Sequence, residues 1–399
     1  MRLTMKEVNR LKVIQECMDG RIRVEEAAQI LKRTPRSVYR MLAKVREKGP
    51  EGILHGNRDR VSPKRIRDNV RKRLVKLALE KYRDINDTHF CEILSRNEGI
   101  TIGRETLRGI LRREQIPPKR KVRRRKYRSR RERKEAFGMM LQIDASPHDW
   151  LEGRGPWLTL VGAKDDATGF VWAHFEEAET TWGYLDLMEE VFKTHGLPLS
   201  LYSDRHSIFH TTREPTIIEQ LQAVVPHTQF ARAMDELGIQ IIKAWTPQAK
   251  GRIERQWGTF QDRLVVEMRL AGAKTLEQAR EVLKGFLREY NRRFCVPPRQ
   301  SAAVFRKAPP KPALRKTLCL KETRVIKKDH TISFEGLVLQ IPYNKKYPCM
   351  ADRQAEVRQY RDGHVEIAYR DFVVARFSSD TITRLLDNKS VKHNMKMAA

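Results

Sequence analysis

A sixteen-residue basic run at positions 119–134 limits what this chain can fold into more than any other feature. It reads KRKVRRRKYRSRRERK and holds twelve Lys or Arg residues against one Glu, a net charge of +11. Its few apolar side chains cannot build a core, and its like charges repel one another. We therefore expect a linker at 119–136 with separately folded parts on either side, so that the chain is multidomain.

The charge of the whole chain indicates its partner. Eighty Lys and Arg residues stand against fifty Asp and Glu residues in 399 positions, a net charge of +30. A field of this sign attracts polyanions, so we expect a nucleic acid as the partner rather than an acidic membrane surface. On this interpretation the linker tracks DNA phosphates through side chains that include Arg123, Arg124 and Arg125. The alternative is a solvated spacer.

Residues 1–60 show three short helical patterns. Thr4 and Glu7 form a capping box before the first, and Thr34-Pro35 suits the N-cap and first position of the third. That third pattern, RSVYRMLAKVREKG, has one apolar stripe and one basic face. Together they predict a helix-turn-helix DNA-binding domain, although a small bundle with a solvated basic face would look similar. The residues expected to contact DNA are Arg36, Ser37, Arg40 and Lys44.

Residues 61–118 repeat this arrangement. Ser62-Pro63 begins one helical pattern, Asp87 can cap a second, and RETLRGILRREQI forms a third before Pro117-Pro118. We expect a second helix-turn-helix DNA-binding domain, with Leu107, Ile110 and Leu111 facing inward. The side chains expected on its DNA face are Arg104, Thr106, Arg108 and Arg112.

Residues 137–305 change character. Three strand-like runs, GMMLQIDAS, WLTLVGAKDD and GFVWAHFEEA, precede a helix at 181–195. A fourth strand, LPLSLYSD, and a fifth, IQIIKA, alternate with helices, the last at about 248–270. This order predicts a mixed α/β sheet with three antiparallel leading strands and later crossovers. The first and fourth strands should be neighbours.

Residues 315–385 contain six short β-like runs, with a hairpin signal at Asp362-Gly363. They predict a small β-barrel, followed by a tail at 386–399. The five cysteines are far apart and form no CxxC pair, so neither a disulfide framework nor a cysteine-rich zinc site is expected. We also expect no signal peptide and no membrane span, because no apolar run approaches about 18 residues.

Three acids occupy positions that suggest catalysis. Asp144 ends the first predicted strand, Asp204 follows the fourth, and Glu254 lies in the long helix that follows the fifth. A single acid at such a place is usually a turn or cap residue, but three converging carboxylates repel unless cations lie between them. Hard oxygen ligands suit Mg²⁺, and two such ions serve phosphoryl transfer. Asp144, Asp204 and Glu254 are therefore the candidate catalytic residues and metal ligands.

At these positions the chain resembles a known family. LYSDRHSIF is similar to the second-aspartate motif of insertion-sequence transposases, and WTPQAKGRIERQWGTFQDRL to their third-acid helix. The resemblance is to DDE transposases with an integrase-like catalytic core, in particular the ISNCY-like group, and it covers most of the chain. It implies an RNase H-like core, two Mg²⁺ ions for which Mn²⁺ can substitute, cleavage at the ends of the element and transfer of the 3′-hydroxyl into target DNA.

Two departures from the family accompany this resemblance. Forty-nine residues separate Asp204 from Glu254, more than the integrase-like pattern usually has, so we interpret the segment around HTTREPTIIEQLQAVVPHT as a surface insertion. Glu267, on the same helix, is the rival third acid. The N-terminal His/Cys zinc unit of retroviral integrases is also missing from this sequence. Near the acids, the candidate DNA contacts are His206, Lys250 and Arg252.

We therefore expect a transposase that binds the terminal inverted repeats of its element, cleaves the ends and joins them to target double-stranded DNA. Holding two ends together implies at least a homodimer on DNA, and the expected compartment is the bacterial cytoplasm, at the nucleoid. Two alternatives remain open at this point. A non-catalytic helix-turn-helix regulator with a degenerate core would share the composition, and a structure-directed nuclease would share the acids.

Overall fold

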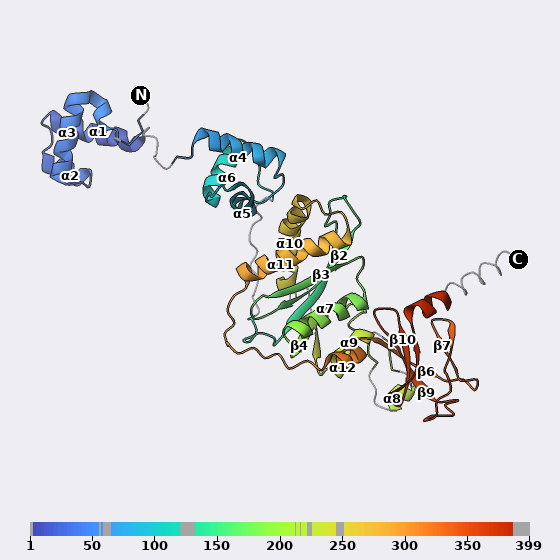
Figure 1. Ribbon diagram of the computed structural model, residues 1–399. Helices are drawn as coiled ribbons and strands as arrows, with labels where there is room; N and C mark the ends of the chain where they lie inside the picture. The colour runs from blue at the N-terminus through green and yellow to red at the C-terminus, as the bar shows by residue number, and fades with distance from the viewer. Residues whose placement is uncertain are drawn as a thin grey trace. The chain divides into compact units, whose positions relative to one another are not determined.

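The structure is a computed structural model of the chain (Figure 1). It describes residues 3–55, 57–58, 65–119, 132–211, 213–215, 217–221, 226–244 and 251–385. The basic run from 120 to 131 and the tail from 386 therefore lie outside the described residues. Two compact units can be separated, one of residues 1–83 with 110–115 and one of residues 84–109 with 116–399.

The first unit begins with the helix-turn-helix that the sequence predicts. Its helices are α1 (Met5–Met18), α2 (Val24–Ile30) and α3 (Pro35–Lys48), followed by the short 3₁₀ helix η1 (Gly49–Ile53). The predicted capping box of Thr4 and Glu7 is formed, and the Thr34 hydroxyl accepts a hydrogen bond from the amide of Ser37. One residue from each helix, Ile14, Ala27 and Val38, is wholly buried, so the three helices share one small core.

The next three helices occupy the region of the second predicted DNA-binding domain. They are α4 (Asp68–Glu80), α5 (Asp87–Glu98) and α6 (Arg104–Arg113). Leu107, Ile110 and Leu111 are buried, as their spacing predicts. The division between the two compact units passes through this region, with α4 in the first unit and α5 in the second. The domain limits expected from the sequence stay predictions.

A five-stranded sheet forms the centre of the second unit. Its strands are β1 (Leu141–His148), β2 (Leu158–Asp165), β3 (Val171–Glu176), β4 (Ser200–Ser203) and β5 (Gln240–Lys243), in the order β3-β2-β1-β4-β5. The first three strands pair antiparallel, whereas β1, β4 and β5 run parallel. The neighbouring first and fourth strands are thus confirmed, and the topology is the RNase H-like one.

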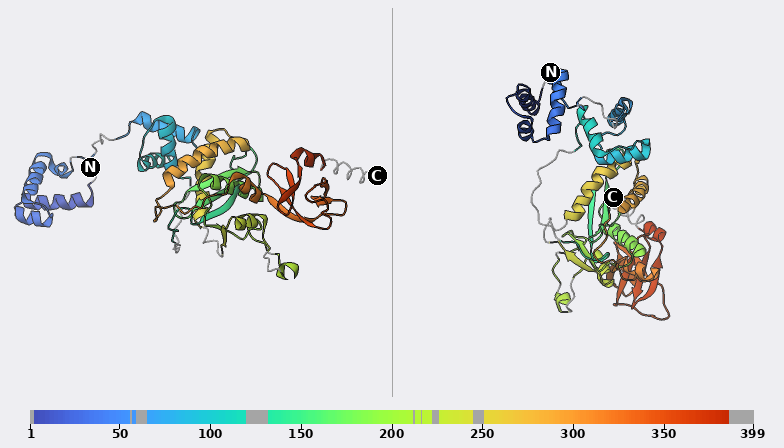
Figure 2. Two further views of the ribbon diagram at one scale, coloured as in Figure 1. Left: turned by 60° about the horizontal axis from the view of Figure 1, so that its bottom comes forward. Right: turned by 90° about the vertical axis from the view of Figure 1, so that its left-hand side faces the viewer.

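Helices cover both faces of this sheet (Figures 1 and 2). The core on one face joins the sheet to α7 (Thr181–Thr194) and α9 (Gln229–Glu236), and that on the other joins it to α10 (Gly251–Leu270) and α11 (Leu276–Phe294). Alternation along the strands explains the division, since Ile143 and Val161 face the first layer while Leu158 and Leu160 face the second. The short α8 (Ile217–Leu221) falls in the expected insertion.

The C-terminal region corrects one expectation, because its strands do not close into a barrel. After α12 (Lys311–Thr317), strands β6 (Leu320–Val325), β9 (Gln354–Gln359), β10 (Val365–Tyr369) and β11 (Phe372–Phe377) form an open sheet in the order β11-β10-β9-β6. Strands β7 (Thr331–Phe334) and β8 (Leu337–Gln340) pair with each other as a separate hairpin. Both sheets bury their apolar sides in one shared core, so the core is covered without pairing the edge strands β6 and β11.

Throughout the described part of the chain, no helix combines the length and the apolar character that crossing a membrane requires.

Candidate active site and DNA interface

Asp144 and Asp204 come from neighbouring strands: Asp204 directly follows β4, whereas Asp144 lies inside β1, which continues to His148 and does not end at Asp144 as the sequence suggested. The parallel register pairs Leu141 with Leu201 and Gln142 with Tyr202. Continued by two residues, this register sets Asp144 beside Asp204, which directly follows β4. Both carboxylates are half-buried. The sheet topology therefore brings together two of the three predicted acids.

The two aspartates share an electrostatic neighbour. Burial raises the pKa of the Tyr184 hydroxyl well above its usual value, with added contributions from Glu179, Asp144 and Asp204. Tyr184 lies on α7 and its hydroxyl donates to Glu179. The charges of both aspartates affect the pKa of this one hydroxyl, which is consistent with the two carboxylates lying close together.

Helix α10 reaches Asp144 because polar contacts hold it across the sheet. Gln261 Nε2 donates to Ser146 Oγ at 3.3 Å, and Trp257 Nε1 donates to Asp144 Oδ2 at 3.0 Å. Ser146 and Asp144 are two residues apart on β1, so their side chains share one face. One side of α10 therefore follows the direction of β1.

The same helix is anchored to β2 nearer its N-terminus. Lys164 Nζ donates to Gln256 Oε1 at 2.8 Å, and the Arg252 guanidinium forms an ion pair with Asp166. Asp166 is 1% exposed and also accepts from Gln142 Nε2 at 2.7 Å. Burial, together with Arg133, Arg255 and Arg252, lowers the pKa of Lys164 to about 8. These contacts fix the first turns of α10, where Glu254 lies.

Glu254 itself is exposed, three residues before Trp257 on α10. Within the described residues no three His, Cys, Asp or Glu side chains lie close enough together to hold a metal ion. The structure thus brings the helix of Glu254 onto Asp144 but does not bring all three carboxylates into one ligand group. The role of Glu254 stays a prediction.

The rival third acid has other partners. Glu267 accepts hydrogen bonds from His89 at 2.9 Å and from Arg96 at 2.8 Å, both on α5. These two contacts lower its pKa against the opposing effect of burial, which is the largest of the influences on it. Glu267 therefore holds α5 against α10, a structural role that favours Glu254 as the third acid.

The remaining candidates near the acids divide into three cases. His206 follows Asp204 closely, and its backbone amide donates to Asp204 Oδ1 at 3.0 Å while its ring accepts from Ile208. Arg252 is held by Asp166, so its guanidinium has a partner within the core. Lys250 lies outside the described residues. Their predicted contacts with DNA stay predictions.

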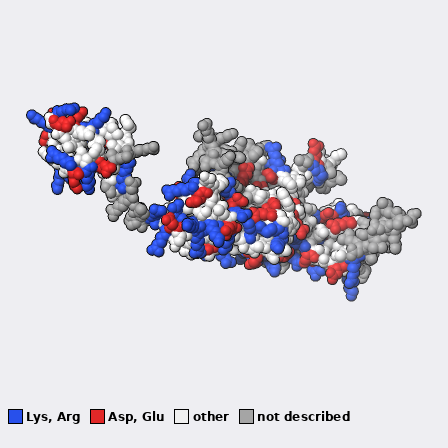
Figure 3. All heavy atoms as spheres, turned by 90° about the horizontal axis from the view of Figure 1, so that it is seen from above, with Lys and Arg blue, Asp and Glu red and all other residues white. Residues whose placement is uncertain are grey.

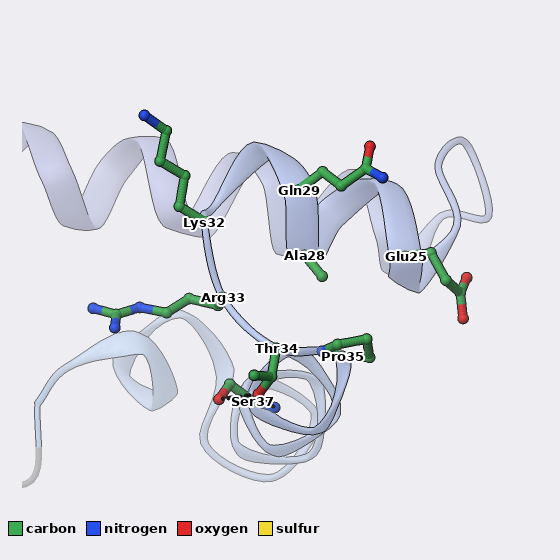
Figure 4. Close-up of a pocket in the computed structure, with 8 residues that line it drawn as sticks. All are labelled: Glu25, Ala28, Gln29, Lys32, Arg33, Thr34, Pro35 and Ser37. Atoms are coloured by element: carbon green, nitrogen blue, oxygen red, sulfur yellow. Dashed lines mark hydrogen bonds between the residues drawn. The ribbon is translucent and has the colours of Figure 1, made fainter.

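The best candidate DNA interface in the first unit is α3 and the turn before it (Figure 4). Arg36, Arg40 and Lys44 are exposed on α3 as predicted, whereas Ser37 also shares a 3.0 Å hydrogen bond with the Thr34 hydroxyl. A pocket of about 610 Å³ lies between α2 and α3. Its wall includes Lys32 and Arg33, two basic residues on the turn that the sequence interpretation passed over.

Tyr39 was also missed, although it is 58% exposed between Arg36 and Arg40 on the same helix. The sequence did contain a signal for Tyr39, because an aromatic residue stands at a position of the helix where a polar residue is expected. Figure 3 shows Lys and Arg side chains spread over the visible surface with Asp and Glu among them.

In α6, Arg104, Thr106 and Arg108 are exposed and Arg112 is half-buried. Arg104 and Arg108 both pair with Glu105 on the same helix, at 2.7 Å and 3.4 Å. Exposed pairs of this kind are weak, so both arginines can exchange Glu105 for a phosphate. Arg123, Arg124 and Arg125 of the basic run lie outside the described residues.

Known proteins resemble parts of this chain. A helix-turn-helix domain family matches residues 9–64. Catalytic core structures of retroviral integrases overlap with this chain, among them that of BIV at 20% identity and a TM-score of 0.28, covering 39% of this chain and 85% of that one. A chain of the simian T-cell lymphotropic virus intasome in complex with PP2A regulatory subunit B56 gamma overlaps at 13% identity and a TM-score of 0.35, covering 75% of this chain and 98% of that one. These TM-scores are too low to support a conclusion about this chain.

Two curated relatives match along most of the chain. The y4bF protein of Sinorhizobium fredii, named as a transposase, is 34% identical over 370 residues, which cover 92% of this chain and 80% of that protein. The transposase for insertion sequence IS1202 of Streptococcus pneumoniae is 30% identical over 368 residues, covering 83% and 77%. Together with the helix-turn-helix and the RNase H-like sheet, this similarity shows that the chain belongs to the transposases of insertion sequences.

Proposed function

We propose that this transposase binds the terminal inverted repeats of its element, cleaves DNA at the element ends and joins the freed 3′-hydroxyls to target double-stranded DNA. The observation that carries the proposal is the parallel pairing of β1 with β4, whose register, continued by two residues, sets Asp144 beside Asp204, together with the contact of Asp144 with the helix that bears Glu254. A family of transposases needs such a centre for phosphoryl transfer, and two adjacent aspartates have little structural reason to stand half-buried together.

The donor set fits a divalent metal. Carboxylate oxygens from Asp144 and Asp204 are hard ligands of the kind that Mg²⁺ and Mn²⁺ accept, and repulsion between them is relieved by a cation. When bound, two such ions supply activation of the attacking oxygen and stabilisation of the leaving oxygen. Glu254 completes the set if its side chain turns toward β1 from the first turn of α10.

The chain's other residues hold the DNA. In the proposal, α3 lies in the major groove with Arg36 and Arg40 at base edges. Arg104 and Arg108 on α6, together with the basic run, neutralise phosphates. Because two ends must be held at once, at least two copies act on the DNA.

The test replaces each acid by its amide. Asp144→Asn, Asp204→Asn and Glu254→Gln should each abolish Mg²⁺-dependent cleavage of an element-end duplex while leaving binding in a gel shift unchanged. The matched control is Glu281→Gln, because Glu281 is an exposed acid on α11 with a side chain 77% exposed. Unimpaired cleavage by Glu254→Gln would show that the third acid is misassigned. A wild-type protein that binds ends but never cleaves them would favour a DNA-binding regulator.

A further inference from the structure

We propose that Trp257 is a positioning residue for Asp144: its indole N–H fixes the carboxylate in the orientation that a metal ion requires. The proposal rests on the proposed function, in which Asp144 is a metal ligand. Trp257 Nε1 donates to Asp144 Oδ2 at 3.0 Å, which is an ordinary distance for a hydrogen bond from a ring N–H. The carboxylate therefore has one oxygen held by the protein itself.

The indole is held firmly enough to act in this way. Trp257 is 6% exposed and packs edge-on against Phe260, with ring centroids 5.9 Å apart. The preceding residue, Gln256, accepts from both Lys164 and Tyr290. A buried side chain that packs against a neighbouring ring, on a helix held by hydrogen bonds from Lys164 and Tyr290, keeps its N–H pointing in one direction.

The indole ring can approach the sheet closely because a glycine lies beneath it. Gly162 is the residue paired with Asp144 across β1 and β2. A Cβ placed on Gly162 would lie 2.5 Å from Cη2 of Trp257, so the missing side chain is what lets the indole reach the sheet. A glycine inside a strand often marks such a close approach.

The physical consequence is preorganisation. Hydrogen bonds from neighbouring groups orient metal ligands, and removing one such partner typically costs about 10- to 100-fold in metal affinity or activity. Trp257 also lies three residues after Glu254, on the same side of α10. The hydrogen bond from Trp257 to Asp144 therefore also sets the distance between β1 and the helical turn that bears Glu254.

Four variants separate orientation from packing. Trp257→Phe removes the N–H and keeps an aromatic ring, whereas Trp257→His keeps a ring N–H. Leu264→Ala is the control for lost packing, because Leu264 is fully buried on the same helix, about two turns after Trp257. Asp144→Asn removes the charge that Trp257 is proposed to hold. We expect Trp257→Phe to raise the Mg²⁺ concentration for half-maximal cleavage about 10-fold or more, Trp257→His to recover part of this loss and Leu264→Ala to leave the requirement unchanged.

A second readout does not depend on activity. In full-length protein labelled with ¹⁵N-tryptophan, the indole resonance of Trp257 is the one that disappears in Trp257→Phe. Titration with Mn²⁺ should broaden this resonance before those of the other indoles, and Asp144→Asn should abolish the broadening. If wild-type protein cleaves DNA while Mn²⁺ leaves the Trp257 resonance sharp, or if Trp257→Phe and Leu264→Ala shift the Mg²⁺ requirement equally, the inference fails and the proposed function stands. A wild-type protein that neither binds Mn²⁺ nor cleaves overturns the proposed function, and this inference with it.

Discussion

Replacing Gly162 by alanine should disturb the candidate active site without touching any acid. The added Cβ would lie 2.5 Å from the Trp257 ring and 3.1 Å from the backbone oxygen of Trp172. Carbon atoms in contact normally lie about 3.5–4.0 Å apart, so the ring must move by about 1 Å. Neither obstacle is flexible, since one is a buried ring and the other is backbone.

The structure also gives the size of the effect. Overpacking of a core costs about 1–3 kcal/mol. A shift of about 1 Å would stretch the 3.0 Å bond between Trp257 and Asp144 beyond hydrogen-bonding distance, and a hydrogen bond to a charged group contributes about 1.5–3 kcal/mol. We therefore expect the free energy of unfolding to fall by about 2.5–6 kcal/mol, measured by urea denaturation. Cleavage should fall about 10-fold or more.

Gly258→Ala is the matched control. Gly258 follows Trp257 on α10, and a Cβ there meets nothing within 4 Å. Alanine in a helix is favoured over glycine by about 0.5–1 kcal/mol, so this variant should be slightly more stable than wild type, with normal cleavage. Gly162→Ala with wild-type stability and wild-type cleavage would show that the indole does not rest on Gly162, and the account of the site given above would be wrong.

Two further predictions concern other parts of the chain. Arg36→Ala, Arg40→Ala and Tyr39→Ala should each relax base preference at one or two positions, by about 1–3 kcal/mol for an arginine that contacts guanine. Selection of binding sites from random DNA measures this preference, and Lys12→Ala, at an exposed position on α1, is the control. If all three variants retain the full preference, the specificity lies in α6 instead. Lys164 has a lowered pKa of about 8 in the folded protein against an ordinary 10.5, so between these values the unfolded chain binds more protons and stability rises with pH. Lys164→Met should remove about 2–3 kcal/mol of that rise, and equal pH dependence of unfolding in both proteins would refute the assignment.

Much of the architecture could be predicted from local patterns. Helical spacing and caps such as Thr4 with Glu7 act within a few residues, so the helix-turn-helix could be identified without a fold. The strand runs around Asp144 and Asp204 are likewise local, and the strand order followed from which segments could cross over. The position of Asp204 directly after a strand was predictable for this reason, whereas the extension of β1 past Asp144 to His148 was not.

Closure of the C-terminal strands was not predictable, because local pattern does not say which edges pair. β6 and β11 remain unpaired with each other since the β7–β8 hairpin already covers their shared core. In the same way, the sequence left Glu267 as a rival to Glu254 on the same helix. The contacts with His89 and Arg96, which lie more than 170 positions earlier in the chain, separate their roles.

The sequence by itself determined the order of the parts, the net positive charge and the placement of Asp144 and Asp204 in or directly after a strand, because each can be read from a local stretch of residues. Only the tertiary structure decided the partner of Asp144. Trp257 is more than a hundred residues away in the chain, and its indole reaches that carboxylate because Gly162 lies opposite on β2 and because Lys164 and Asp166 hold α10 in place. Hydrogen bonds between side chains so far apart exist only once the helix has packed on the sheet, and no local pattern encodes that distance.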